Sequence, residues 1–171
     1  MPADAAKATG LLFVAVVLQL AIMANVTILG GHPNLLLVTL VCVALLRGAE
    51  FGAVAGFCAG LLADTGVFGT LGFTALLLTV AGYWTGRYGE TTGRDRAHAP
   101  LLSIAVITIL YQTAELVLRF LLGQNAPAGA IFSGLVPTVV LNLLLTLPVY
   151  AFARRLLRPR EWAVREVRLL G

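Results

Sequence analysis

The stretch Phe51–Asp64, FGAVAGFCAGLLAD, carries a glycine at every fourth position of an otherwise apolar segment. Gly52, Gly56 and Gly60, which we call the glycine ladder, fall on one face of a helix, and a row of alanines beside them widens the same stripe. Glycine is a poor helix former in water. In lipid, however, small residues let two helix backbones approach closely, and this contact holds membrane helices together. The stretch therefore predicts a membrane helix with a second helix packed flat on the ladder.

The helix that contacts the ladder belongs either to this chain or to a partner protein, and the sequence leaves both alternatives open. Asp64 follows Gly60 by four residues and precedes the glycine-rich stretch TGVFGTLG. An acidic side chain at a membrane boundary commonly ends a helix, and it can accept hydrogen bonds from backbone amides of the next turn. We therefore favour a structural role for Asp64 over ligand or ion binding.

The composition of the whole chain is that of a membrane protein. Of its 171 residues, 59% are hydrophobic and 12% are charged, whereas a soluble domain carries about 25% charged residues. The apolar runs are continuous rather than alternating, which indicates helices and not a β-barrel. We expect Cys42 and Cys58, both inside apolar runs, to be small buried hydrophobes. The net charge of +4 indicates basic loops on the cytoplasmic side more than a nucleic-acid partner.

Six apolar runs predict an all-α integral membrane protein, a six-helix transmembrane bundle. The runs occupy residues 11–29, 34–46, 51–63, 70–88, 100–122 and 131–153. The first run follows a weakly basic start and is longer than the core of a signal peptide, so we expect an uncleaved helix. The membrane domain then covers residues 1–157, and a basic amphipathic cytoplasmic tail covers residues 158–171. Three roles are open for this tail: it fixes the topology of the protein, it lies on the anionic inner leaflet, or it docks a cytoplasmic protein.

The second and third runs are each shorter than the ~20 residues that a full span needs. Fusing them into one helix would place Arg47 and Glu50 near the middle of the bilayer, at a cost of roughly 2.5–3.5 kcal/mol for each charge. Two short helices with Arg47 at the surface cost less, because arginine can snorkel and the bilayer can thin. A re-entrant hairpin over residues 34–63 would leave the rest of the topology unchanged.

The distribution of positive charge supports six spans. With a cytoplasmic N-terminus, eleven of the twelve Lys and Arg residues lie inside. These are Lys7, Arg47, Arg87, Arg94, Arg96, Arg154, Arg155, Arg158, Arg160, Arg165 and Arg168. Five spans leave nine of twelve inside at best. We therefore predict a multi-pass protein of the bacterial inner membrane with both termini in the cytoplasm.

Two predicted spans carry polar side chains at membrane depth. In residues 100–122, Gln112, Glu115 and Arg119 share one helical face with Tyr111, and Glu115 and Arg119 are spaced for an ion pair within the helix. A charge inside a membrane suggests a functional site, but a structural pair facing the bundle explains it equally well. In residues 131–153, we expect Asn142 to form an interhelical hydrogen bond.

The sequence predicts no catalytic residues, metal site or cofactor. It lacks the motifs of serine hydrolases, zinc proteases and phosphate-binding loops. His32 and His98 fall in loops on opposite sides of the predicted membrane and cannot share a site. An enzyme is therefore not expected.

Short motifs spread over nearly the whole chain resemble the bacterial rod shape-determining protein MreD family. They are Pro33-Asn34-Leu35-Leu36-Leu37, Leu46-Arg47-Gly48, Phe51-Gly52, Gly56-Phe57, Gly60-Leu61-Leu62, Gly69-x-x-Gly72, Gly82-Tyr83-x-x-Gly86-Arg87 and Pro137-x4-Asn142-x5-Pro148-x-Tyr150. The resemblance implies a non-catalytic membrane scaffold of the cell-elongation machinery. It also implies partnership with the bitopic protein MreC, and indirectly with the MreB filament and the RodA/PBP2 peptidoglycan synthase.

Two functions remain after this resemblance. In the first, the bundle binds the membrane helix of MreC through its last four helices, with the glycine ladder as the docking face. In the second, the chain is a small-molecule-binding subunit, since the helix arrangement of the family is similar to the substrate-binding subunits of energy-coupling-factor vitamin transporters. The second function would use Asp64, Tyr111, Gln112 and Glu115.

Overall fold

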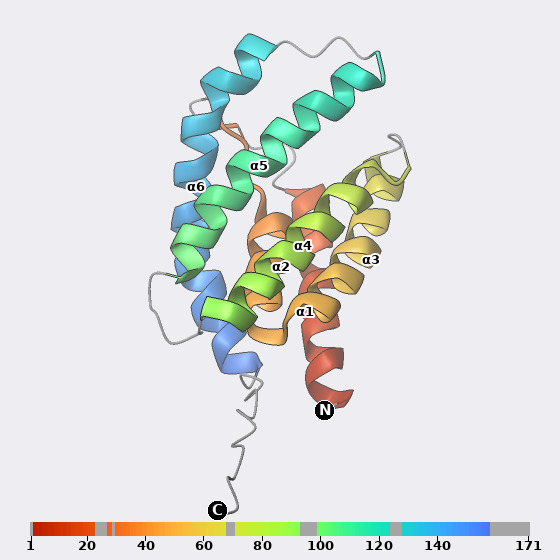
Figure 1. Cartoon of the computed structure of the whole chain (residues 1–171), viewed down its shortest axis with the longest axis vertical. Coiled ribbons are helices and arrows are strands. Elements are labelled where there is room, and N and C mark those ends of the chain that lie inside the picture. Colours follow the sequence, from red (N-terminus) through yellow and green to blue (C-terminus); the bar gives the residue numbers. More distant parts are fainter. Residues whose placement is uncertain are drawn as a thin grey trace, which may run out of the picture.

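The computed structural model describes residues 2–22, 27–28, 30–67, 71–92, 99–123 and 128–157. The helices are α1 (Pro2–Ala21), α2 (Leu35–Arg47), α3 (Ala49–Val67), α4 (Phe73–Thr92), α5 (Ala99–Leu121) and α6 (Ala128–Leu156). Apart from an isolated bridge between Ile28 and Gly31, the ordered secondary structure of these residues is helical. Successive helices run in opposite directions, so both chain termini lie at one end of the bundle, which we call the terminal end (Figure 1).

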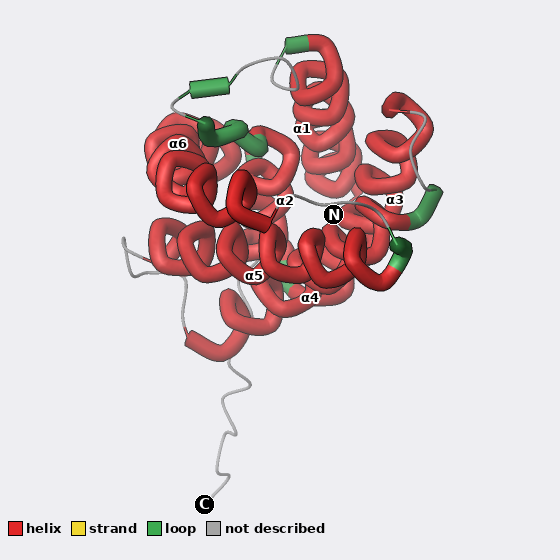
Figure 2. The backbone as a smooth tube through the Cα atoms, turned by 90° about the horizontal axis from the view of Figure 1, so that it is seen from above, coloured by secondary structure: helices red, strands yellow, loops and turns green. Residues whose placement is uncertain are grey.

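The short helix α2 forms the centre of the bundle. Every residue from Leu36 to Leu46 is buried, and α1, α3, α4, α5 and α6 all contact α2. Figure 2, viewed from above, shows α2 surrounded by the other helices. Its 13 residues span about 20 Å, less than the ~30 Å hydrocarbon core of a bilayer. The helix is apolar on all sides because all of its sides meet protein.

The second and third predicted spans are separate helices and not one long helix. Gly48 stands between them with φ +96°, a conformation that favours glycine, and its N–H donates to the carbonyl of Ala44 at 2.8 Å. α3 begins at the next residue. Arg47 is the last residue of α2 and is partly exposed. Its guanidinium carbon lies 5.4 Å from the ring centroid of Phe51. This position keeps the charge at the terminal end of the bundle.

α1 begins and ends earlier than the apolar run 11–29 that predicts it. The alanine-rich start favours helix, and Pro2 suits a first helical position. Near the end of the run the backbone turns instead: Ile28 and Gly31 exchange N–H···O hydrogen bonds of 3.0 and 2.9 Å around Gly30, whose φ is +79°. Hydropathy carries the predicted run to Leu29 because residues 22–29 are mostly apolar, although α1 ends at Ala21.

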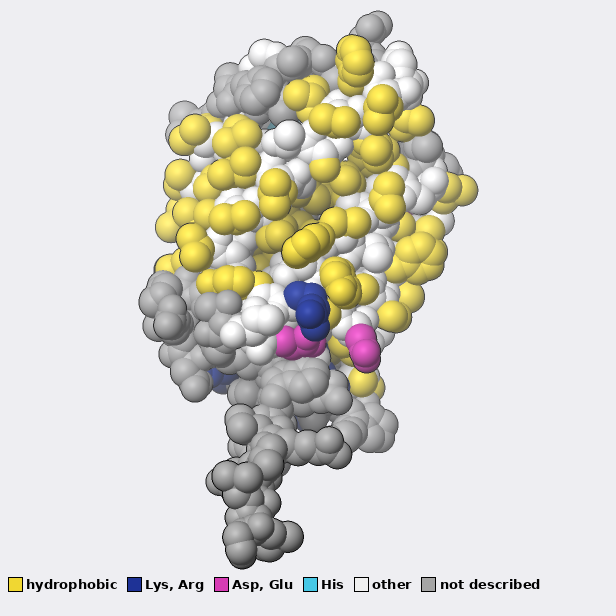
Figure 3. Space-filling model, viewed as in Figure 1, with side chains coloured by type: hydrophobic (Ala, Val, Ile, Leu, Met, Phe, Trp, Pro, Cys, Tyr) yellow, Lys and Arg dark blue, Asp and Glu magenta, His cyan; other side chains and the backbone are white. Residues whose placement is uncertain are grey.

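The outer surface of the bundle is apolar. Among the described residues, two helical segments are long and apolar enough to cross a membrane, Pro100–Leu121 and Gly134–Leu156, each with mean hydropathy 1.9. Only 22% and 17% of these windows are buried within the protein. Figure 3 shows hydrophobic side chains over most of the visible face, with the charged ones gathered toward the terminal end. A soluble monomer rarely exposes so continuous an apolar surface.

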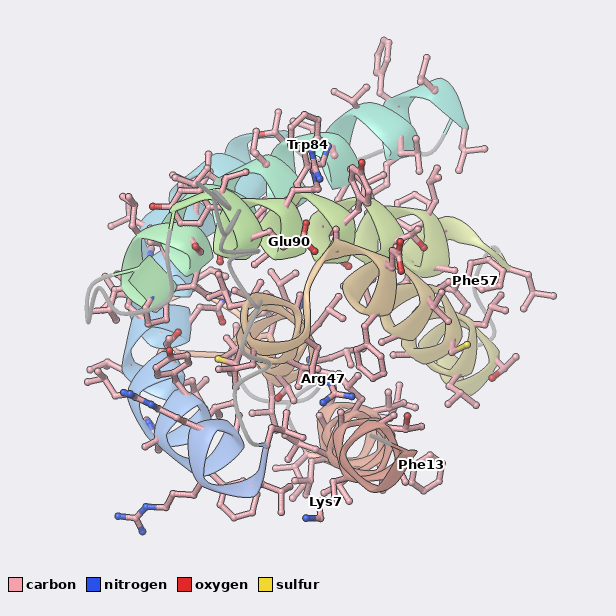
Figure 4. All side chains as sticks on the ribbon, turned by 60° about the horizontal axis from the view of Figure 1, so that its bottom comes forward. Lys7, Phe13, Arg47, Phe57, Trp84 and Glu90 are labelled. Atoms are coloured by element: carbon pink, nitrogen blue, oxygen red, sulfur yellow. The ribbon has the colours of Figure 1, made fainter. Side chains whose placement is uncertain are left out.

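One expectation about the cysteines is wrong. Cys42 is buried in α2, but Cys58 is exposed on α3. The reason is the helical period. The ladder and the neighbouring Ala59 face the protein, which turns residues 57 and 58 outward. Phe57 accordingly projects from the bundle, as does Phe13 of α1 (Figure 4).

Candidate functional sites

The glycine ladder lies against α4 of the same chain. A Cβ atom added to Gly52 would stand 2.5 Å from the carbonyl oxygen of Gly82, and one added to Gly56 or Gly60 would clash with the backbone of Leu78 or Ala75. Such distances are shorter than real Cβ contacts. The two helix backbones therefore touch along the full ladder, and a side chain at any of its three glycine positions would force α3 and α4 apart.

α4 contributes its own glycines to this contact, and the sequence reasoning missed them. Gly82 faces the carbonyl of Gly52, and Gly86 faces the backbone of Ala49. The four-residue spacing of Gly82 and Gly86 is the same signal that marked α3, so it could have identified the partner helix. Because α4 covers the ladder, its face is not open to the membrane helix of another protein in this structure.

Asp64, near the end of α3, caps the start of α4. Its Oδ2 accepts the N–H groups of Gly72 at 2.9 Å and Ala75 at 3.3 Å, and its Oδ1 accepts that of Thr74 at 3.0 Å. The side chain is 5% exposed. A carboxylate in this position satisfies N–H groups that a helix start leaves unpaired and complements the helix dipole. These contacts explain Asp64 without a ligand.

Glu90 makes the matching contact at the opposite end of the same helix pair. Its Oε1 accepts the N–H of Ala49, the first residue of α3, at 2.9 Å. Its Oε2 lies 3.5 Å from Nη1 of Arg87. The sequence reasoning did not identify Glu90, because nothing in its local pattern shows that it reaches a helix 41 residues earlier.

Asn142 joins three helices in the interior. Its Oδ1 accepts the N–H of Asn34, just before α2, at 2.9 Å, and its Nδ2 donates to Oγ1 of Thr108 on α5 at 3.1 Å. The residue is fully buried. An amide so placed fixes α6 against α5 and the start of α2, because a buried polar group without a partner is costly.

The entry to α2 is held by further side chains from α1 and α6. Gln19 accepts the N–H of Leu35 at 2.8 Å, and Oγ1 of Thr138 accepts the N–H of His32 at 3.1 Å. Asn34 caps α2 by accepting the N–H of Leu37 at 2.9 Å. The first N–H groups of a helix have no partner within the helix, and these side chains supply partners for α2.

A polar cavity of about 370 Å³ opens beside this network, at the end of the bundle away from the termini; we call it the distal cavity. Three residues of the predicted polar face of α5 line it, namely Tyr111, Gln112 and Glu115, together with Asn34 and Asn142. Oε1 of Gln112 is buried and has no hydrogen-bond partner among the described residues. Gln112 therefore lines the cavity as a residue, while its Oε1 is enclosed by protein.

Glu115 and Arg119 form the ion pair that their spacing predicts. Nε and Nη2 of Arg119 donate to Oε1 of Glu115 at 3.0 and 2.6 Å. The guanidinium also lies 5.7 Å from the ring centroid of Phe73 at the start of α4. The pair therefore links α5 to α4 while Glu115 lines the distal cavity, which fits both the structural and the functional interpretation.

The predicted polar residues thus occupy different parts of the bundle. Tyr111, Gln112, Glu115 and Asn142 meet at the distal cavity, whereas Asp64 does not line it and Arg47 lies at the terminal end. Figure 4, turned to bring that end forward, shows Arg47 and Lys7 close to α1. Within the described part of the chain, no group of three His, Cys, Asp or Glu residues is arranged to hold a metal ion.

A bundle of apolar helices that contact through glycines, with its ion pairs at the helix ends, defines a helical membrane protein. The family model of the rod shape-determining protein MreD matches residues 8–160, and the chain belongs to this family. It is accordingly a membrane protein with a role in bacterial rod-shape determination. No curated protein and no solved structure matches the chain.

Proposed function

We propose that this chain is a non-catalytic membrane scaffold of the cell-elongation machinery. In this role it binds MreC and, through MreC, couples the MreB filament to the RodA/PBP2 peptidoglycan synthase. The observation that carries the proposal is the family match over residues 8–160. The interior supports it, because the buried carboxylate of Asp64 and amide of Asn142 are engaged in holding helices together.

The scaffold has six spans and both termini in the cytoplasm. Lys7 lies in the first turns of α1, Arg47 ends α2, and Arg154 and Arg155 lie in the last turn of α6. All of these belong to the terminal end, whereas Arg119 belongs to the distal end of α5. An excess of Lys and Arg marks the cytoplasmic side, so the distal cavity opens to the outside.

The membrane helix of MreC needs a docking face other than the covered ladder. We place it in a groove of about 230 Å³ between α4 and α5, lined by Trp84, Tyr88, Ser103, Val106 and Leu110 among others. Ser103 is 7% exposed, and its Oγ has no partner among the described residues. The lining is otherwise mostly apolar and aromatic, so the packing of an incoming membrane helix would cover this groove.

Site-specific photocrosslinking tests the contact in cells. A photoreactive residue in place of Val106 should crosslink to MreC, whereas one in place of Leu144, which is also exposed and lies on α6, should not. Equal crosslinking from both positions, or none from either, would contradict docking in the α4–α5 groove. A crosslink from Leu144 alone would move the docking face to α6.

A second candidate function is the binding of a small molecule in the distal cavity. It is favoured by one observation, a cavity of about 370 Å³ that Tyr111, Gln112 and Glu115 line together. The similarity to energy-coupling-factor subunits stays a prediction. Candidate vitamins should then raise the melting temperature of the purified protein, and Gln112→Leu should abolish the rise. A melting temperature unchanged by every candidate would count against this function.

A further inference from the structure

A second groove, of about 440 Å³, lies between the first turn of α5 and the last turns of α6. Its wall on α6 consists of two rows of residues spaced by four, Leu147–Ala151–Arg155 and Thr146–Tyr150–Arg154, and Pro100 and Leu101 line it from α5. Both rows end in an arginine. The first row is apolar before its arginine, and in the second row Thr146 is buried in the protein. We call this second groove the basic groove.

The two arginines of the basic groove have no ion-pair partner among the described residues. Both are exposed, and no described carboxylate lies within ion-pair distance of either, whereas Arg87 and Arg119 are each paired with a glutamate. Their position in the last turn of α6 is favourable because the carbonyl end of a helix attracts cations. Two arginines from the last turn of α6 thus line one groove.

We propose that the basic groove binds an anionic phospholipid. The phosphate lies between Arg154 and Arg155, since guanidinium groups match the geometry of phosphate oxygens. One acyl chain lies along Leu101, Leu147 and Ala151. Basic pockets between membrane helices on the cytoplasmic side are typical sites for anionic lipid headgroups. The site depends on the membrane location of the chain and not on MreC, so it goes beyond the proposed scaffold function.

The shape of the groove favours a whole lipid over a free anion. A soluble phosphate would use the arginines alone and leave the apolar wall uncovered. Leu147 is 60% exposed and Phe152 is 56% exposed, so this wall continues into the lipid-facing surface of α6. A lipid covers the charged end and the apolar wall together.

Native mass spectrometry of the full-length protein in mild detergent tests the proposal. Phosphatidylglycerol should be retained in preference to phosphatidylcholine with the same acyl chains. Arg154→Gln with Arg155→Gln should weaken its binding about tenfold or more. Arg87→Gln, which removes an exposed arginine outside the groove, is the matched control and should change binding little. Both groove arginines are exposed, so their replacement should lower the melting temperature only slightly, through the loss of favourable charge at the end of α6.

The apolar wall is tested separately by Ala151→Trp, which fills the groove, with Leu144→Trp on the exposed face of α6 as its control. The first should weaken phosphatidylglycerol binding severalfold, and the second should not. Equal retention of both lipids, or an equal effect of Arg87→Gln, would overturn the site. Inorganic phosphate could displace phosphatidylglycerol as effectively as the lipid itself does, or Ala151→Trp could have no effect. Either result would show a site for an anion without a lipid chain and would overturn the proposal of a bound lipid.

Discussion

Asp64 and Glu90 cap each other's helices at opposite ends of the antiparallel α3–α4 pair. Asp64, on α3, accepts three backbone N–H groups at the start of α4, and Glu90, on α4, accepts the N–H of the first residue of α3. Between these two caps, the helix backbones touch through the glycine ladder. The α3–α4 pair is therefore fixed at both ends and along its length, and it acts as a single rigid element.

Replacing Asp64 by alanine should destabilise the protein, because three N–H groups at a buried helix start lose their acceptor. A cost of roughly 1–3 kcal/mol is expected for such a loss, measured as a lower free energy of unfolding in detergent. Thr65→Ala is the control, since the exposed Thr65 hydroxyl only donates to the carbonyl of Leu62. A stable Asp64→Ala variant that had lost only partner or ligand binding would contradict the capping role.

Replacing Gly56 by leucine should separate α3 from α4, because the new side chain would meet the backbone of Leu78. Overpacking of this kind costs about 1–3 kcal/mol or more, visible as a lower melting temperature in detergent. Gly10→Leu is the matched control, since Gly10 is helical and exposed and has open space where a Cβ atom would stand. Equal stability of the two variants would show that the ladder contact is not tight.

The hydrogen bond between Asn142 and Thr108 should be measurable by a double-mutant cycle. We expect Asn142→Leu and Thr108→Val to be non-additive, with a coupling of roughly 0.5–2 kcal/mol, the range for polar contacts between membrane helices. The free energies of unfolding of both single variants and the double variant give the coupling. Additive losses would mean that Asn142 acts mainly through the backbone of Asn34.

The proposed six-span topology predicts the side of the membrane from which a thiol reagent reaches each helix end. In a variant without Cys42 and Cys58, a cysteine in place of Glu50 or Arg155 should react with an impermeant thiol reagent only from the cytoplasm. A cysteine in place of Leu122, at the end of α5, should react only from outside. Protection of the Glu50 position from both sides would place the α2–α3 junction inside the bilayer.

Much of the fold follows from local sequence. Apolar runs locate the helices, and the cost of burying Arg47 and Glu50 predicts the break that Gly48 provides. The central position of α2 does not follow, because an apolar run looks the same whether lipid or protein surrounds it. The end of α1 at Ala21 was missed for a related reason, since residues 22–29 are mostly apolar like the helix before them.

The candidate sites were less predictable, because they depend on contacts between distant segments. Tyr111, Gln112 and Glu115 share a helical face that the sequence reveals. The distal cavity is also lined by the segment before α2 and by the middle of α6. These two segments meet at the hydrogen bond between Asn34 and Asn142, which are 108 residues apart in the sequence. The sequence leaves open which helix packs on the glycine ladder. The structure shows that it is α4 of the same chain and not a helix of another protein.

Co-purification of the full-length chain with MreC in mild detergent, with RodA and PBP2 present, tests the scaffold function most directly. We predict a stable complex that survives size-exclusion chromatography and that Leu144→Trp leaves intact, while Val106→Trp weakens it. A folded protein that elutes without MreC under these conditions would contradict the scaffold function and favour small-molecule binding in the distal cavity.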